Sequence, residues 1–225
     1  MSSFEVTGGK KLYGEITPQG SKNEALQIIS AVLLTSEKVT INNIPDITRC
    51  EFADRIIGRI RVKIERVNPH TCIFQADDVD VHYLHSDDYH KKSGRLRGSV
   101  MLAGPMLARF KKAFIPKPGG DKIGRRRLDT HIKGFEKLGA KILYDTEDSF
   151  FHLQADELQG TYLLLDEPSV TGTANLLMAA VMANGTTTIY NAACEPYIQQ
   201  LCKMLMGMGA KINGVGSNML ISGRH

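Results

Sequence analysis

Two stretches of the chain follow one pattern, and this pattern decides the expected fold. Residues 129–141 read DTHIKGFEKLGAK, and residues 195–211 read EPYIQQLCKMLMGMGAK. In each, apolar residues recur at helical spacing, a glycine (Gly139 or Gly209) ends the helix, and Ala-Lys-Ile begins a strand. Pro196 stands where a first helical residue is expected. The two Ala-Lys-Ile segments lie 70 positions apart, so the pattern predicts an internal repeat.

An earlier copy of the repeat is expected upstream. Residues 39–43 (VTINN) resemble residues 187–191 (TTIYN), and residues 45–47 (PDI) resemble residues 196–198 (PYI). Each copy opens with a helix rich in small residues, expected over 25–34, 96–109 and 173–183, and each ends in two strands. The sequence therefore predicts an α/β domain of three similar units, each built as helix, strand, helix and two strands, with the helices central.

Composition narrows the class of protein. The 225 residues are 42% hydrophobic and 23% charged, as in ordinary globular domains. The first ten residues lack the apolar run of a signal peptide, and no segment approaches a membrane span, so a cytoplasmic location is expected. The four cysteines have no metal-ligand spacing and are expected to be reduced thiols: Cys50, Cys72, Cys194 and Cys202.

Positive charge is concentrated in one stretch, residues 109–129. It contains eight basic residues against Asp121 and Asp129, and Pro118 and three glycines lie within it. Such a segment is either a solvated basic surface loop or a mobile lid that binds phosphate or carboxylate. Asp121 should stay ionised among these cations unless a bound anion or burial raises its pKa, in which case it can donate a proton.

Two predicted helix starts also suit an anion. Ser21 and Glu24 form a capping box that begins a helix at Lys22, so Lys22 and Asn23 fall in the first turn, where free N–H groups favour negative charge. In residues 168–173 (PSVTGT), Ser169 and Thr171 are both candidate N-caps. The plainer alternatives are a solvent-facing lysine and a simply capped helix.

Together these stretches resemble the UDP-N-acetylglucosamine 1-carboxyvinyltransferases, an enolpyruvyl transferase family. The resemblance covers the whole chain and rests on residues 20–23 (GSKN), 96–99 (LRGS) with 104–110 (GPMLARF), 118–129 and 168–170 (PSV). It implies transfer of the enolpyruvyl group of phosphoenolpyruvate to the 3-hydroxyl of UDP-N-acetylglucosamine, the first committed step of peptidoglycan synthesis. It also implies an inverse α/β barrel of repeated units and no metal or organic cofactor.

The resemblance assigns residues to this chemistry. Asp121, Lys22 and Arg126 take the catalytic roles, with Lys22, Arg97 and Arg126 at the phosphoenolpyruvate site. The residues expected to bind the two substrates are Lys22, Asn23, Arg97, Arg126, Arg127, Leu128, Asp129, Thr130, Glu167, Pro168, Ser169 and Val170.

The chain departs from the family pattern at three positions. Asp121 stands where most members carry cysteine, which predicts resistance to fosfomycin, because that drug alkylates the thiol. Thr171 replaces a usual glycine, and Arg127 replaces a common proline. Family members are also about twice as long, with two similar domains. We therefore expect residues 1–21 to pair with a second domain, residues 22–225 to form the first domain, and this half alone to lack turnover.

Two other functions compete with this prediction. The shikimate-pathway enolpyruvyl transferase shares the fold, but its loop usually reads Asp-Lys-Ser where this chain has residues 21–23 (SKN). A non-catalytic domain that binds anions or nucleic acid is the other alternative. Against nucleic acid, Phe114 is the lone aromatic residue among the basic residues of 111–129, and base stacking needs aromatic side chains. We therefore expect no nucleic-acid and no membrane partner.

Overall fold

The computed structural model describes residues 3–45, 49–94, 96–116, 127–147 and 149–223. Three units of similar construction follow one another along the chain. The first comprises α1 (Lys22–Ala31) with η1 (Val32–Leu34), β1 (Lys38–Ile41), the π-helix η2 (Arg49–Ile57), β2 (Lys63–Asn68) and β3 (Thr71–Gln75). After a connection through η3 (His82–His85) and α3 (Asp87–Ser93), the second unit begins.

The second and third units repeat this order. The second comprises η4 (Arg97–Leu102) with α4 (Ala103–Phe110), β4 (Lys112–Pro116), α5 (Asp129–Lys137), β5 (Lys141–Asp145) and β6 (Phe150–Gln154). The third comprises β7 (Tyr162–Leu164), α6 (Val170–Ala180), β8 (Thr186–Tyr190), α7 (Pro196–Gly207), β9 (Lys211–Asn213) and β10 (Met219–Ser222).

Strand pairing confirms the predicted repeat. In each unit the last strand lies between the other two, in the orders β1-β3-β2, β4-β6-β5 and β8-β10-β9, and these pairs are antiparallel. Sheet three gains a fourth strand, because β7 pairs parallel with β8. Segments 132–153 and 198–221 therefore have the same element order and the same pairing.

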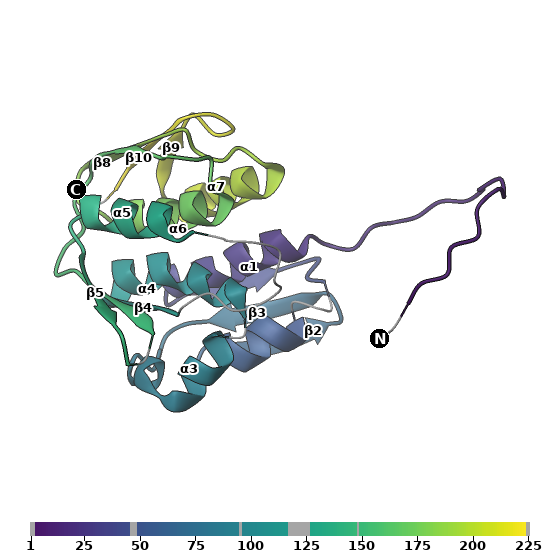
Figure 1. Cartoon of the computed structure of the whole chain (residues 1–225), viewed down its shortest axis with the longest axis horizontal. Coiled ribbons are helices and arrows are strands. Elements are labelled where there is room, and N and C mark those ends of the chain that lie inside the picture. The colour runs from purple at the N-terminus through teal and green to yellow at the C-terminus, as the bar shows by residue number, and fades with distance from the viewer. Residues whose placement is uncertain (1–2, 46–48, 95, 117–126, 148, 224–225) are drawn as a thin grey trace.

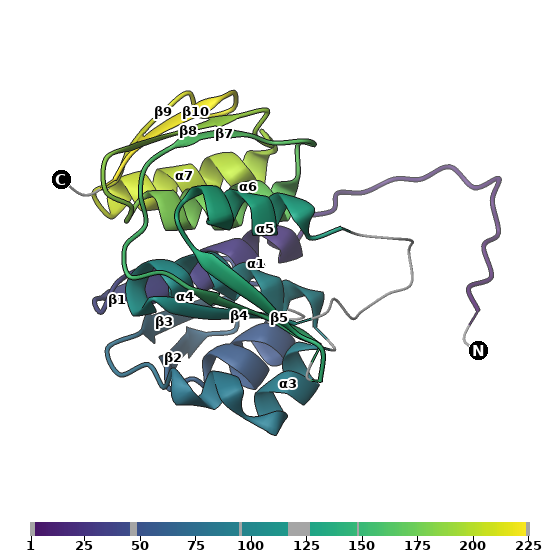
Figure 2. The ribbon, with the colours of Figure 1, turned by 60° about the vertical axis from the view of Figure 1, so that its left-hand side comes forward.

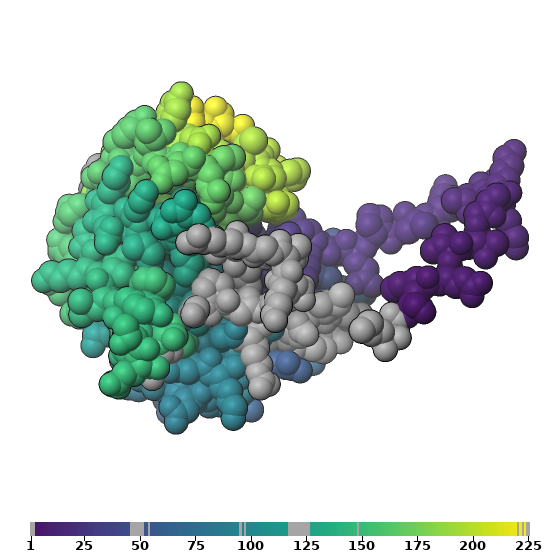
Figure 3. Space-filling view, viewed as in Figure 1, coloured from purple at the N-terminus to yellow at the C-terminus, as the bar shows by residue number. Residues whose placement is uncertain are grey.

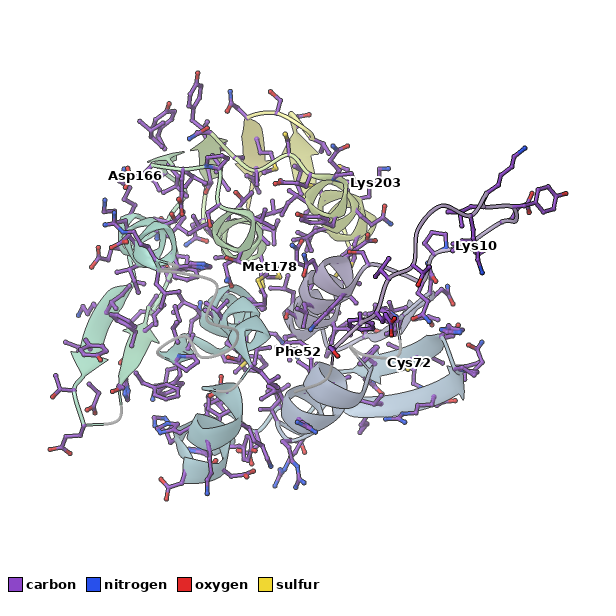
Figure 4. The ribbon with its side chains drawn as sticks, turned by 45° about the vertical axis from the view of Figure 1, so that its right-hand side comes forward. Lys10, Phe52, Cys72, Asp166, Met178 and Lys203 are labelled. Carbon is purple, nitrogen blue, oxygen red and sulfur yellow. The ribbon has the colours of Figure 1, made fainter. Side chains whose placement is uncertain are left out.

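Apart from α3, which lies at the lower edge of the domain, the labelled helices lie toward the inside and the sheets toward the outside, as the repeat predicted (Figure 1). Helix α6 is central: every residue from Gly172 to Ala180 is buried, because its sequence is apolar or small on all sides. It packs against α4, α5 and α7. Met178 of this helix lies in the interior between the layers (Figure 4).

Glycines set the close approach of these helices. A Cβ at Gly104 of α4 would lie 2.3 Å from the backbone oxygen of Asn175 in α6, and a Cβ at Gly134 of α5 would lie 2.4 Å from the Leu176 side chain. Only glycine lets backbones approach so closely without a shift. These contacts hold the start of α4 and the body of α5 against the middle of α6.

One expectation needs correction. The helix expected over 96–109 begins as a 3-10 helix, and regular α-helix starts at Ala103. The second helix of unit one is the π-helix η2, and residues 46–48, which belong in part to the segment that resembles the start of α7, lie outside the described residues. Residues 3–20 contain no helix or strand and extend away from the domain (Figure 3). Their large apolar side chains are exposed: Phe4, Val6, Leu12, Tyr13 and Ile16.

Candidate functional site

Helix α1 starts as the capping pattern predicted. Ser21 has an extended backbone, and its Oγ accepts the N–H of Glu24 at 3.3 Å. Lys22 and Asn23 occupy the first turn and are exposed. A lysine here lies close to the positive end of the helix dipole and to free N–H groups, while Glu24 in the same turn carries the opposite charge, so the attraction for an anion comes from Lys22 and the free N–H groups. This is a favourable place for an anion.

Helix α6 starts at the second predicted cap. The Oγ of Ser169 accepts the N–H of Gly172 at 3.2 Å, so Ser169 is the N-cap. The alternative cap, Thr171, is wrong: it lies within the first turn, and its hydroxyl contacts His131 instead. A Cβ at Gly172 would lie 2.7 Å from Thr130 Cγ2, so this glycine lets the starts of α5 and α6 touch.

The start of α5 carries paired charges. Arg127 Nε donates to Asp129 Oδ2, and this contact holds the pKa of the Asp129 carboxyl below its ordinary value. One turn later, Lys133 Nζ lies 2.7 Å from Asp166 Oδ2, which joins α5 to the segment that leads into α6. Asp166 lies on the outside of the domain (Figure 4). Both carboxylates are therefore already occupied by cations of this domain.

The starts of α1, α5 and α6 face the same side of the domain (Figure 2). Each contributes N–H groups and the positive end of a helix dipole; Lys22 adds a positive charge, whereas the charge of Arg127 is paired with Asp129. Leu128 and Thr130 flank the start of α5, and Thr130 is buried. Glu167 and Pro168 are exposed just before Ser169, and Val170 is half-buried. The free N–H groups and dipoles of these helix starts are features that favour a negatively charged ligand.

Not every predicted site residue can be placed on this side. Asp121 and Arg126 lie outside the described residues. Arg97 begins η4, whose next residue, Gly98, packs so closely on Leu26 of α1 that a Cβ there would lie 2.9 Å from it. The backbone of Arg97 is thus close to α1.

Sequence reasoning missed a buried polar group behind the helix starts. Asn175 is fully buried; its Oδ1 accepts the N–H of Gly104 at 2.7 Å, and its Nδ2 donates to the carbonyl of Val100 at 2.9 Å. Nδ2 also lies 3.2 Å from Nδ1 of buried His131, whose Nε2 lies 3.1 Å from Thr171 Oγ1. The one sequence signal for this group is an asparagine inside an otherwise apolar helix.

Among the residues that the structure describes, no helix combines the length and the apolarity needed to cross a membrane. Within the same residues, His, Cys, Asp and Glu side chains form no group of three or more that could hold a metal ion.

Curated relatives match nearly the whole chain. It is 60% identical over 220 residues to the UDP-N-acetylglucosamine 1-carboxyvinyltransferase of Bacteroides thetaiotaomicron, covering 98% of this chain and 51% of that protein. The proteins of the same name from Porphyromonas gingivalis and Borreliella burgdorferi are 58% and 46% identical, again over 98% of this chain and 51% and 50% of theirs. The chain thus spans about half the length of the curated relatives it matches.

Solved structures share the fold at lower identity. The enolpyruvyl transferase NikO from Streptomyces tendae has a TM-score of 0.79 at 19% identity, covering 96% of this chain and 50% of that one. An EPSP synthase from Acinetobacter baumannii has a TM-score of 0.68 at 16% identity, over 94% and 47% of the two chains. The EPSP synthase (3-phosphoshikimate 1-carboxyvinyltransferase) family model matches residues 6–225, and the chain belongs to this family.

Proposed function

We propose that this chain supplies one half of an active site that transfers the enolpyruvyl group of phosphoenolpyruvate to the 3-hydroxyl of UDP-N-acetylglucosamine. The supporting observation is 58–60% identity, over 98% of the chain, to proteins named for this reaction. The family model is named for the shikimate enzyme, but the curated relatives favour the nucleotide sugar as acceptor. The reaction would be the first committed step of peptidoglycan synthesis, in the cytoplasm.

The helix starts are suited to these two substrates. Phosphoenolpyruvate carries a phosphate and a carboxylate, and we assign it to Lys22 and Asn23 at the start of α1, with Arg97 and Arg126. The UDP-sugar carries a diphosphate, and we assign it to residues 126–130 and 167–170, at the starts of α5 and α6. Fixed cations and N–H groups stabilise charge that develops in a transition state, which is usually the largest catalytic contribution.

The proposed chemistry has two steps. In the addition, the sugar oxygen bonds to C2 of phosphoenolpyruvate, the hydroxyl proton leaves to a base outside this half, and Asp121 gives a proton to the methylene carbon C3. In the elimination, the new methyl group loses a proton, the C2–C3 double bond re-forms, and the C2–O bond to phosphate breaks. The products are the enol ether and inorganic phosphate. Lys22, Arg97 and Arg126 hold the phosphate and the carboxylate throughout.

The domain assignment uses the length of the relatives. They are about twice as long as this chain, so we assign residues 22–225 to the first domain and residues 1–21 to a strand that pairs with a second domain. The exposed apolar side chains of residues 4–16 support this assignment, since an apolar segment is stabilised when another surface covers it.

Reconstitution tests the function directly. The chain is mixed with the separately produced second half of the Bacteroides thetaiotaomicron relative, and phosphate release from phosphoenolpyruvate is measured with UDP-N-acetylglucosamine or 3-phosphoshikimate as acceptor. We expect turnover with the nucleotide sugar, none with this chain alone, and loss of turnover in Lys22→Ala. Turnover with 3-phosphoshikimate in place of the nucleotide sugar would overturn the proposed acceptor.

The same assay tests the role of Asp121. A carboxylate is a poorer nucleophile than a thiolate toward an epoxide, so fosfomycin should leave the native pair active and should inactivate the Asp121→Cys variant. Asp121→Asn should turn over roughly 10²–10⁴-fold more slowly, the usual contribution of a general acid. If Asp121→Asn matched the native rate, Asp121 would be a counter-ion for its arginine neighbours and not the proton donor.

A further inference from the structure

The buried polar group behind α5 and α6 determines which nitrogen of His131 carries hydrogen. The amide of Asn175 has one possible orientation, because its oxygen accepts a backbone N–H from Gly104 and its nitrogen donates to the carbonyl of Val100. The second hydrogen on Asn175 Nδ2 points to His131 Nδ1 at 3.2 Å, a better acceptor than Met101 Sδ at 4.0 Å. His131 Nδ1 must therefore be unprotonated.

The tautomer of His131 determines in turn the hydrogen bond that the Thr171 hydroxyl makes with it. A neutral imidazole with an accepting Nδ1 carries its hydrogen on Nε2. His131 Nε2 then donates to Thr171 Oγ1 at 3.1 Å. A threonine hydroxyl that accepts on one side keeps its own single hydrogen to donate elsewhere. A doubly protonated His131 would set two donors, Nδ1–H and the Asn175 amide, against each other in a buried site.

We propose that Asn175 and His131 are positioning residues that turn the Thr171 hydroxyl hydrogen toward a phosphate oxygen of the UDP-sugar at the start of α6. This inference rests on the proposed function. Thr171 is the second residue of α6, so its hydroxyl adds a side-chain donor to the N–H groups of the first turn. The resulting preference is for a diphosphate over an uncharged nucleoside.

Binding of UDP-N-acetylglucosamine, measured by calorimetry on the chain itself, tests the role of Thr171. Thr171→Val keeps the shape and removes the hydroxyl, and should weaken binding about tenfold to a hundredfold, as expected for a hydrogen bond to a charged group. Thr171→Ser should stay close to the native affinity, and Thr186→Val, an exposed site on β8, is the matched control. Uridine, which lacks the diphosphate, should bind all variants equally.

A second pair of measurements tests the positioning by His131. Nitrogen chemical shifts of ¹⁵N-labelled histidine should show the hydrogen of His131 on Nε2; a hydrogen on Nδ1 would overturn the inference. His131→Phe should weaken UDP-N-acetylglucosamine binding but add nothing to the loss in Thr171→Val, since it acts through that hydroxyl. If His131→Phe fails to fold, the Thr171 pair and the nitrogen shifts still decide.

The outcomes separate the two proposals. No binding of UDP-N-acetylglucosamine by the native chain, or by the reconstituted pair, would count against the proposed function, while the nitrogen shifts would still report on His131. Native binding that is unchanged in Thr171→Val would leave the proposed function standing and overturn the inference.

Discussion

Helices α1 and α6 both begin at a serine whose Oγ accepts the N–H three residues on, at 3.3 and 3.2 Å, yet the surroundings of the two helix starts differ. At α1, Ser21 and the two residues after it are exposed. At α6, Thr171 is half-buried against His131, and Gly172 packs on Thr130 of α5.

The two helix starts differ in their charged side chains and in how firmly their hydrogen-bond donors are held. The start of α1 carries charged side chains: Lys22, which opposes the helix dipole, and Glu24, which suits it. The start of α6 has no charged side chain in its first turn, but neighbouring helices hold its donors in place. We infer that α1 contributes mainly electrostatic attraction, whereas α6 contributes oriented hydrogen bonds. Five substitutions test this difference between the two helix starts and their supports, in order of decreasing expected effect.

The largest effect is expected at Asn175. Asn175→Ala leaves the buried N–H of Gly104 and the carbonyl of Val100 without their partner, and each such group costs about 1–3 kcal/mol. Chemical denaturation should show a loss of about 2–5 kcal/mol in unfolding free energy. The control is Asn184→Ala, an exposed asparagine that bonds Glu157. Equal losses in the two variants would mean that the buried group does not hold α6 in place.

The two serine caps give the next effect. Ser169→Ala and Ser21→Ala each remove one capping hydrogen bond, worth about 0.5–2 kcal/mol. We expect Ser169→Ala near the upper end, because this hydrogen bond is partly buried, and Ser21→Ala near the lower end, because water can replace the exposed bond. Thermal unfolding of both variants, with Ser→Thr at each site as the conservative control, measures the difference. A reversed order would contradict the comparison.

Lys22 should give a smaller effect of opposite sign. Lys22→Gln removes a cation from the positive end of α1 and should stabilise the unliganded chain by about 0.3–1 kcal/mol at low salt. The gain should shrink at high salt, where the field is screened. Lys10→Gln, in the extended N-terminal segment, should change nothing (Figure 4). A destabilised Lys22→Gln variant would show that the lysine supports the fold.

The smallest effect is expected at Asp166, which lies in the segment that leads into α6 and pairs with Lys133 of α5. Its hydrogen bond from Lys133 lowers the pKa of the carboxyl below the ordinary value of 3.8. A carboxyl with a lowered pKa in the folded state stabilises the protein above its ordinary pKa, and that contribution disappears as the pH falls through the folded value. Urea unfolding at pH 5, 4 and 3 should show a shallower pH dependence in Asp166→Asn. Asp156→Asn, at an exposed aspartate, is the control.

Several elements could be predicted because their causes lie within a few residues. Gly139 and Gly209 have φ values of +97° and +102°, which glycine adopts readily just beyond α5 and α7. Pro196 begins α7 as expected, because the first helical residue does not need its N–H. The repeat of these signals predicted three units, and the strand orders confirmed them.

The predictions from sequence were wrong or incomplete where contacts with distant segments determine the local structure. The helix expected over 96–109 starts as a 3-10 helix, and this stretch packs on α1, α4 and α6. Thr171 was a plausible cap by composition, but only Ser169 has the extended backbone that an N-cap requires. The roles of His131 and Asn175 had no local signal beyond one polar residue in an apolar helix.

The starts of α1 and α7, the glycine stops after α5 and α7 and the threefold repeat of units follow from the sequence alone, because capping bonds and backbone preferences act over three or four residues. Contacts between distant segments determine which helix starts touch and which polar atoms pair. Asn175 meets His131 across 44 residues of sequence and Gly104 across 71. Such contacts form because burial leaves those atoms no water to bond, so the fold has to supply the partners.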